Sequence, residues 1–168
     1  MQQMWSPWRM AYILSDKQAG CVLCDIMEAP DDRKRLVLHR GGRAFLALNK
    51  YPYNNGHLMV VPYHHVDTLE ALSAAELADV MALVTLGIRA LRAAMRPEGF
   101  NIGANIGKVA GAGVEDHVHV HVVPRWTGDT NFMSVLGEVR VIPQALCETY
   151  DQLKAALDAV LAEGTEAT

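Results

Sequence analysis

The chain has 168 residues, 51% of them hydrophobic and 20% charged, which are the length and composition of one ordinary globular domain with a sizeable core. Its formal net charge of -4 and the lack of a basic stripe argue against nucleic acid as a partner, whereas a small anionic ligand held by backbone N–H groups remains compatible with that charge. No apolar run reaches the roughly 18–20 residues that span a bilayer. The odd number of cysteines (three) and the lack of a signal-peptide pattern at the N-terminus argue against a secreted disulfide scaffold, so we expect a cytoplasmic protein without a membrane partner.

The domain organisation predicted from the sequence is a single domain over residues 1–168. Residues 1–19 are expected to be an N-terminal arm, because its first 14 positions mix aromatic and basic side chains that suit packing on the body or on a partner subunit. Residues 162–168 are expected to be a disordered tail.

The first half of the chain predicts a helical turn followed by strands. A helical turn is expected over 25–28, and apolar runs bounded by turn residues predict strands over 36–39, 44–48 and 57–62. The clearest helix runs from Ser73 to Met95, where Ser73 and Glu76 form a capping-box pattern and apolar residues, Met81 included, recur at helical spacing.

The second half predicts two further strands and a last helix. The strands are expected over 100–105 and 118–123, and the helix over about 143–161, with Cys147 as a plain core residue. Strands lie on both sides of one long helix, and their connections suit hairpins better than repeated βαβ units. The sequence therefore predicts an α+β domain with a mostly antiparallel sheet.

Three histidines alternate with valines in the segment 117–123. Because strand side chains alternate between faces, His117, His119 and His121 are expected on one face and the valines on the core face. Such a row of imidazoles suits zinc ligation, or attack on phosphorus by one imidazole while its neighbours orient it. Three exposed histidines on a polar strand face are the third interpretation. A glycine-rich loop, 105–113, runs into this strand and favours the phosphorus chemistry, because bare N–H groups can hold phosphate oxygens there.

A Cys-x-x-Cys motif, Cys21 and Cys24, lies near the start of the chain. The pair is half of a zinc site, a redox pair, or two buried reduced cysteines. A redox pair fits poorly, since the surrounding sequence offers little βαβ pattern. A structural zinc site needs two further ligands.

The run 117–123, followed by Pro124-Arg125-Trp126, resembles the motif His-φ-His-φ-His-φ-φ of the histidine triad family, where φ is hydrophobic. The similarity extends over about residues 20–130 and includes residues 48–49, the stretch 56–62 and the long helix. Residues 4–10 and 126–132 are similar to a bacterial branch that includes diadenosine tetraphosphate phosphorylases and hydrolase-like proteins. The resemblance implies the histidine triad fold.

The resemblance also implies roles for residues of this chain. The catalytic set would be His119, which attacks the α-phosphate and forms a nucleotidyl-histidine intermediate, His121, which orients it and bonds a phosphate oxygen, and His57, a fourth histidine from a neighbouring strand. The nucleotide-binding residues implied, besides His119 and His121, are Asn49 near the ribose, the phosphate loop and a tryptophan after the motif: Asn49, Asn105, Gly111, Ala112, Gly113 and Trp126. For Trp126, core or interface packing is the alternative.

Two further expectations concern the metal and the loop. Relatives with a Cys-x-x-Cys pair complete a structural zinc site with residues that correspond to His65 and His117, with His64 as the register alternative to His65, and no catalytic metal is required. Many members carry Gln, Ser or Thr where this chain has Gly113, so a side-chain contact to phosphate is missing there.

The function implied is cleavage at the α-phosphate of an adenine nucleotide derivative such as a diadenosine polyphosphate, by a homodimer paired through the long helix and a strand. Three alternatives stay open. They are an adenosine phosphoramidase, a nucleotide-binding regulatory protein with weak activity, and a metal-binding module whose triad holds zinc.

Overall fold

The computed structural model describes residues 20–129 and 144–166. Its elements in chain order are α2 (Val22–Glu28), α3 (Asp32–Arg35), β1 (Val37–Arg40), β2 (Ala44–Leu48), β3 (Leu58–Pro62), α4 (Ala74–Met95), β4 (Gly99–Ala104), the 3-10 helix η1 (Lys108–Ala110), β5 (Val120–Arg125) and α6 (Leu146–Glu166). The predicted N-terminal arm, 1–19, lies outside the described residues.

The five strands form one sheet in the order β1-β2-β3-β5-β4, and every neighbouring pair is antiparallel. The predicted α+β class with an antiparallel sheet is therefore confirmed. β5, the last strand of the described residues, lies between β3 and β4, and on its β3 side His121 pairs with Met59 and Val122 with Leu58. This order brings the histidine run next to the strand that follows His57.

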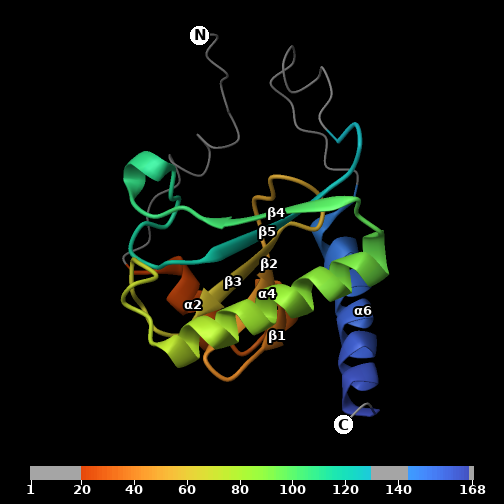
Figure 1. Cartoon of the computed structure of the whole chain (residues 1–168), viewed down its shortest axis with the longest axis horizontal. Helices are drawn as coiled ribbons and strands as arrows, with labels where there is room; N and C mark the ends of the chain where they lie inside the picture. The colour runs from red at the N-terminus through yellow and green to blue at the C-terminus, as the bar shows by residue number, and fades with distance from the viewer. Residues whose placement is uncertain (1–19, 130–143, 167–168) are drawn as a thin grey trace.

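Helices cover the sheet on both sides. α4 lies across one face and packs against α6, as Figure 1 shows. The main core lies between these two helices and the alternate strand residues that point toward them: Leu46, Leu48, Leu58, Val60, Val120 and Val122. On the other face, Leu23 of α2 packs against Phe45 and Val61 in a smaller cluster.

The long helix begins and packs as its sequence predicts. The Ser73 hydroxyl accepts from the Glu76 N–H (3.3 Å), and the Glu76 carboxylate accepts from the Ser73 N–H (2.7 Å), so the capping box is present. Gly87 lets the helix approach the sheet closely, because a Cβ there would stand 3.2 Å from Leu58 Cδ1 and 3.3 Å from Leu46 Cδ1.

Five local features differ from the predictions. α2 begins at Val22, between the two cysteines, rather than at residue 25, and α3 has no counterpart among the predictions. α6 continues through 162–166, so these residues are helical rather than part of a disordered tail. Met81 is 54% exposed on α4, and Cys147 is exposed on α6 instead of lying in the core. Within the described residues, no helix combines the length and apolarity needed to cross a membrane.

Candidate functional site

The histidine run lies on the face of the sheet opposite α4. Val120 and Val122 belong to the core between the sheet and α4, and the alternation of the strand places His119 and His121 on the other face. All three triad histidines are buried, as is His57. The interpretation as three exposed histidines on a polar face is therefore wrong. β5 itself begins at Val120, so the ladder starts later than the predicted strand.

One hydrogen bond fixes the proton of His119. Its Nδ1 lies 2.9 Å from the carbonyl oxygen of His117. A carbonyl oxygen only accepts, so Nδ1 carries the proton and Nε2 keeps the lone pair of the neutral ring. Burial lowers the pKa of His119 below its usual value, which keeps the ring neutral at pH 7. An imidazole in this state is a nucleophile at Nε2.

A chain of hydrogen bonds sets the proton of His121 in the same way. The backbone N–H of Tyr53 donates to Nδ1 of His57 (3.0 Å), and the Asn49 amide nitrogen lies 3.3 Å from the same atom. Nδ1 of His57 is thus an acceptor, and Nε2–H of His57 donates to Nδ1 of His121 (2.9 Å). His121 consequently carries its own proton on Nε2. That atom is buried and has no hydrogen-bond partner among the described residues.

The unpartnered Nε2–H of His121 is the clearest sign of a ligand position, because buried polar groups are normally paired. Burial, followed by the charge of His119, lowers the pKa of His121 to about 4, so the ring is neutral near pH 7 and offers a hydrogen bond rather than a charge. The His119 and His121 rings lie 4.8 Å apart at 75°. The pair therefore presents a lone pair and a donor side by side.

Tyr53 is a site residue that the sequence analysis missed. Besides its N–H bond to His57, its ring stacks at a tilt on His57 (centroids 4.6 Å apart) and on His121 (5.5 Å). The loop 49–56 is recognisable in the sequence as rich in turn formers, but a backbone N–H aimed at a histidine has no sequence pattern of its own.

A cavity of about 530 Å³ lies beside the two histidines, which is within the usual range for a small-molecule site. Its wall includes five of the predicted site residues, namely Asn49, Gly111, Gly113, His119 and His121. The rest of the wall is largely apolar, with residues from α2 and from the sheet. Four other predicted site residues do not line it: His57, which lies behind His121, Asn105, Ala112 and Trp126.

In this conformation, one of the backbone N–H groups that the glycine loop was expected to offer to phosphate is already hydrogen-bonded within the loop. The N–H of Gly111 donates to the carbonyl of Lys108 (3.0 Å) and closes η1, so it is engaged within the loop. Gly111 and Gly107 have positive φ angles of 85° and 78°, conformations that favour glycine.

Trp126 belongs to a turn that a carboxylate holds together. Asp129 accepts from the Trp126 N–H (3.2 Å), from the Arg125 guanidinium (2.7 Å) and from the Asn54 amide (2.8 Å). The bond to Asn54 ties this turn to the loop that carries Tyr53. Arg125 is therefore engaged by a carboxylate on its own turn.

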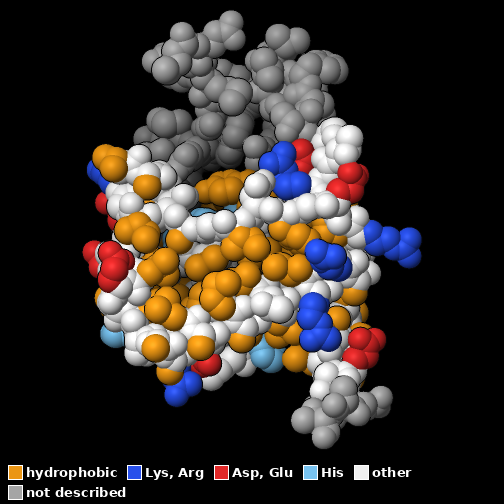
Figure 2. All heavy atoms as spheres, viewed as in Figure 1, with side chains coloured by type: hydrophobic (Ala, Val, Ile, Leu, Met, Phe, Trp, Pro, Cys, Tyr) orange, Lys and Arg blue, Asp and Glu red, His pale blue; other side chains and the backbone are white. Residues whose placement is uncertain are grey.

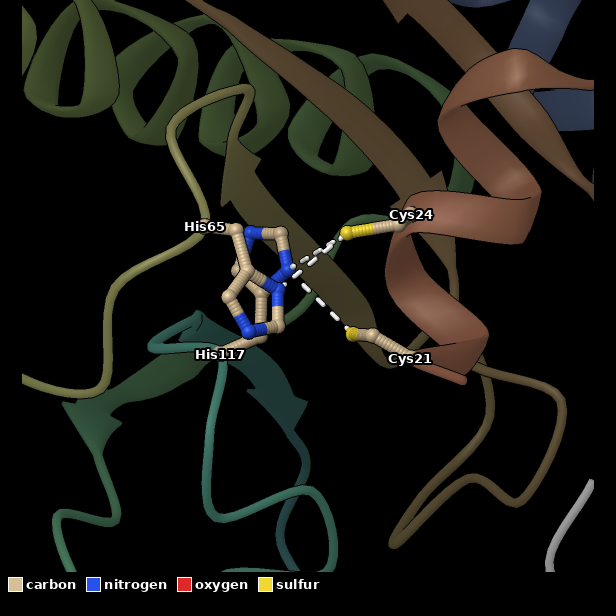
Figure 3. Close-up of side chains that lie close together, drawn as sticks. All are labelled: Cys21, Cys24, His65 and His117. Carbon is tan, nitrogen blue, oxygen red and sulfur yellow. Dashed lines mark hydrogen bonds between the residues drawn. The ribbon is translucent and has the colours of Figure 1, made fainter. Parts of the chain in front are cut away.

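A second cluster, shown in Figure 3, joins the N-terminal cysteines to the triad. The ligand atoms of Cys21, Cys24, His65 and His117 all lie within 4.8 Å of one another and could hold a metal ion. Cys21 Sγ lies 3.4 Å from His117 Nδ1, and Cys24 Sγ lies 3.2 Å from His65 Nδ1. His64, the register alternative, instead faces Glu76 at 3.2 Å. The helical start at Cys21 turns both thiols toward the histidines.

The protonation of the cluster suits a metal. Nε2–H of His117 donates to the carbonyl of Pro62 (2.9 Å), which leaves Nδ1 as the lone-pair atom that faces the thiols. Burial raises the pKa of the Cys24 thiol to about 11, so without a cation the thiol stays protonated. Two sulfurs and two imidazole nitrogens are a donor set that zinc prefers.

Comparisons with known proteins agree with this geometry. Residues 32–128, which contain strands β1 to β5 and the histidine run, match the family model described as the HIT domain. A protein named AP-4-A phosphorylase from Mycobacterium tuberculosis is 43% identical over 157 residues, which cover 89% of this chain and 80% of that protein. Adenosine 5′-monophosphoramidase from Saccharomyces cerevisiae is 30% identical over 107 residues, 64% of this chain and 63% of that protein. Among solved structures, a zinc-bound histidine triad family protein from Mycobacterium smegmatis superposes with a TM-score of 0.69 at 29% identity, covering 86% of this chain and 97% of that one.

Proposed function

Because this chain belongs to the histidine triad (HIT) family, as its sequence motif predicts, we propose that it cleaves an adenine nucleotide derivative at the α-phosphate by nucleotidyl transfer through His119. The observation that carries the proposal is the pairing of a lone-pair nitrogen on His119 with an unpartnered N–H on His121, beside a cavity of nucleotide size. A diadenosine polyphosphate is the proposed substrate, which the 43% identity to an AP-4-A phosphorylase supports.

In the first step, Nε2 of His119 attacks the α-phosphorus and forms a P–N bond while the P–O bond to the leaving group breaks. The Nδ1–H bond to the His117 carbonyl becomes stronger as the ring gains positive charge, and so stabilises the imidazolium. Nε2–H of His121 donates to an oxygen of the phosphoryl group, where negative charge is held during the transfer. Tyr53 and His57 hold that donor in place.

In the second step, water or inorganic phosphate attacks the phosphorus of nucleotidyl-His119, and the P–N bond breaks. Water gives adenosine monophosphate, and phosphate gives adenosine diphosphate.

Asn49 lines the cavity close to His57, which supports the role expected for it near the ribose. The roles expected for Ala112, Gly113 and Trp126 remain part of the proposal, as does that of Asn105 in the phosphate loop.

We propose that the cluster Cys21, Cys24, His65 and His117 binds one structural zinc ion. Four protein ligands close the tetrahedral shell, and the ion then ties α2 to the segment that leads into β5. The zinc-bound family structure supports this assignment. His117 serves both sites, since its Nδ1 faces the thiols and its carbonyl holds the proton of His119.

We also propose that the protein is a homodimer that pairs through α4 and β4. β4 is an edge strand of the sheet, Ile102 on it is 47% exposed, and Met81 on α4 is 54% exposed. Figure 2 shows hydrophobic side chains gathered over these two elements. Light scattering is expected to give a dimer mass for the wild type and a monomer mass for Ile102→Lys, with Val109→Lys on the loop as control; a monomeric wild type would contradict the pairing.

The second candidate is hydrolysis of an adenosine phosphoramidate, which the similarity to the yeast monophosphoramidase favours. Both reactions share the first step, so a substrate panel separates them. We expect the wild type to cleave diadenosine tetraphosphate faster than adenosine 5′-phosphoramidate, and to form adenosine diphosphate when phosphate is present. His119→Ala should lower kcat by at least about 10⁴-fold while nucleotide binding survives. Nucleotide binding without any turnover by the wild type would contradict the proposal and favour a regulatory protein.

A further inference from the structure

The cavity beside the histidines has a positively charged wall on the side of α3. Among the described residues that line it, four are basic, Arg33, Lys34, Arg35 and Lys50, and none is Asp or Glu. The whole chain carries a net charge of -4, so this segregation does not follow from a general excess of basic residues. A wall of one charge sign concentrates ligands of the opposite sign in a cleft.

The four cations are not equally available to a ligand. Arg33 forms a two-bond ion pair with Asp151 of α6 (3.0 and 2.7 Å), which neutralises much of its charge. Lys50 lies 5.7 Å from the centroid of the Tyr51 ring. The side chains of Lys34 and Arg35 are exposed, and neither has an ion-pair partner among the described residues. Lys34 and Arg35 are therefore the charges that a ligand can use.

The histidine pair does not need these charges to bind the phosphate under attack. His119 and His121 supply a lone pair and a hydrogen bond to the α-phosphate of the proposed substrate, and the glycine loop lies beside them. Cations elsewhere in the same cavity serve an additional anionic group. A polyphosphate chain carries one negative charge on each further phosphate, whereas the amine released from a phosphoramidate is neutral or cationic and gains nothing from such a wall.

We propose that Lys34 and Arg35, assisted by Lys50, select substrates whose leaving group is a polyphosphate and discriminate against amine leaving groups. This inference rests on the proposed function and names its substrate class. The two cations act on binding of the leaving group and leave the bonds made to the α-phosphorus unchanged. Their removal is therefore expected to raise KM for polyphosphates and to leave phosphoramidate cleavage as it is.

The test compares the double variant Lys34→Ala/Arg35→Ala with the wild type on diadenosine tetraphosphate and adenosine 5′-phosphoramidate, without added phosphate. Two exposed charge contacts at about 0.7 kcal/mol each correspond to about a tenfold loss of kcat/KM for the tetraphosphate, through KM. The control is Arg43→Ala/Lys154→Ala, which removes the same charge from exposed ion pairs with Asp79 and Asp158, outside the cavity wall. An equal loss on both substrates, or no loss, would overturn the proposal.

Two further measurements distinguish a failure of this inference from a failure of the proposed function. If the defect appears only when inorganic phosphate is added as acceptor, the wall binds the acceptor and the assignment to the leaving group is wrong. If the wild type cleaves neither substrate, calorimetry with AMP and α,β-methylene ATP decides. Tighter binding of the triphosphate analogue, with the preference reduced about tenfold in the double variant, supports the charged wall, and equal affinities refute it.

Discussion

Replacement of His57 by leucine tests the hydrogen-bond chain that orients His121. The imidazole of His57 accepts from the Tyr53 N–H and donates to Nδ1 of His121, and its side chain is fully buried. Leucine fills a similar volume but offers neither function. The proton of His121 is then no longer held on Nε2, and the N–H of Tyr53 loses its acceptor.

The magnitude follows from the two lost bonds. A buried hydrogen bond contributes about 1.5 kcal/mol, so the preference of His121 for the Nε2–H form weakens by about tenfold. Complete loss of a donor to the transferred phosphoryl group costs about 10²–10³-fold in kcat, which sets the upper bound. We therefore expect His57→Leu to lower kcat by about 10–100-fold. The unpaired Tyr53 N–H lowers the free energy of unfolding by about 1–3 kcal/mol.

The assay is steady-state cleavage of diadenosine tetraphosphate together with urea unfolding. His57→Gln keeps an acceptor and a donor in one side chain and is expected to recover part of the kcat. His39→Leu on β1 is the matched control, since His39 is half-buried and does not line the cavity. A kcat of His57→Leu within twofold of the wild type, in a folded protein, would refute the orienting role of His57.

Three further predictions concern stability. Cys24→Ala should abolish zinc binding, measured by elemental analysis, and lower the free energy of unfolding by at least about 3 kcal/mol. Cys147→Ala, on the surface, should change neither quantity. A zinc content unaffected by Cys24→Ala would contradict the site. The pKa of His121 is about 4 in the folded protein and about 6.5 in the unfolded chain, so between these values the unfolded chain gains a proton that the folded protein excludes. The free energy of unfolding is therefore expected to drop by on the order of 3 kcal/mol as the pH falls to 4. Chelator-treated protein that is equally stable at pH 7 and pH 4.5 would contradict this. Gly56→Ala should lower the free energy of unfolding by about 1–3 kcal/mol, because φ at this position is +75° and a Cβ would stand 2.8 Å from a methionine sulfur. Gly99→Ala is the control in the same thermal melts, because a Cβ there meets nothing within 4 Å.

The sequence predicts most of the fold because its strongest local signals agree with the tertiary structure. The capping box at Ser73 and the helical spacing of apolar residues place α4 within one residue of its observed start. Alternation in the histidine run correctly places Val120 and Val122 in the core. Signals with less than two turns of periodicity fail, as for α3, whose four charged residues carry no apolar pattern.

The site is predictable as a set of residue types and unpredictable in its protonation. The resemblance selects the Cys and His residues that the fold gathers into one cluster. It cannot show that the Pro62 and His117 carbonyls fix the tautomers of His117 and His119, because backbone oxygens have no sequence identity. Cys147 illustrates the limit on helices, since it directly follows Leu146 and lies exposed beside the face that α6 buries.

The most direct test of the account is to trap the intermediate. The wild type is mixed with diadenosine tetraphosphate without added phosphate, quenched in base within milliseconds to keep the acid-labile P–N bond, digested and analysed by mass spectrometry. Nucleotidyl transfer through His119 predicts one adenylyl group on the peptide that contains His119, its loss when phosphate is added before the quench, and no adduct in His119→Ala. Rapid turnover with no adduct on that peptide, together with substantial activity in His119→Ala, would contradict nucleotidyl transfer through His119.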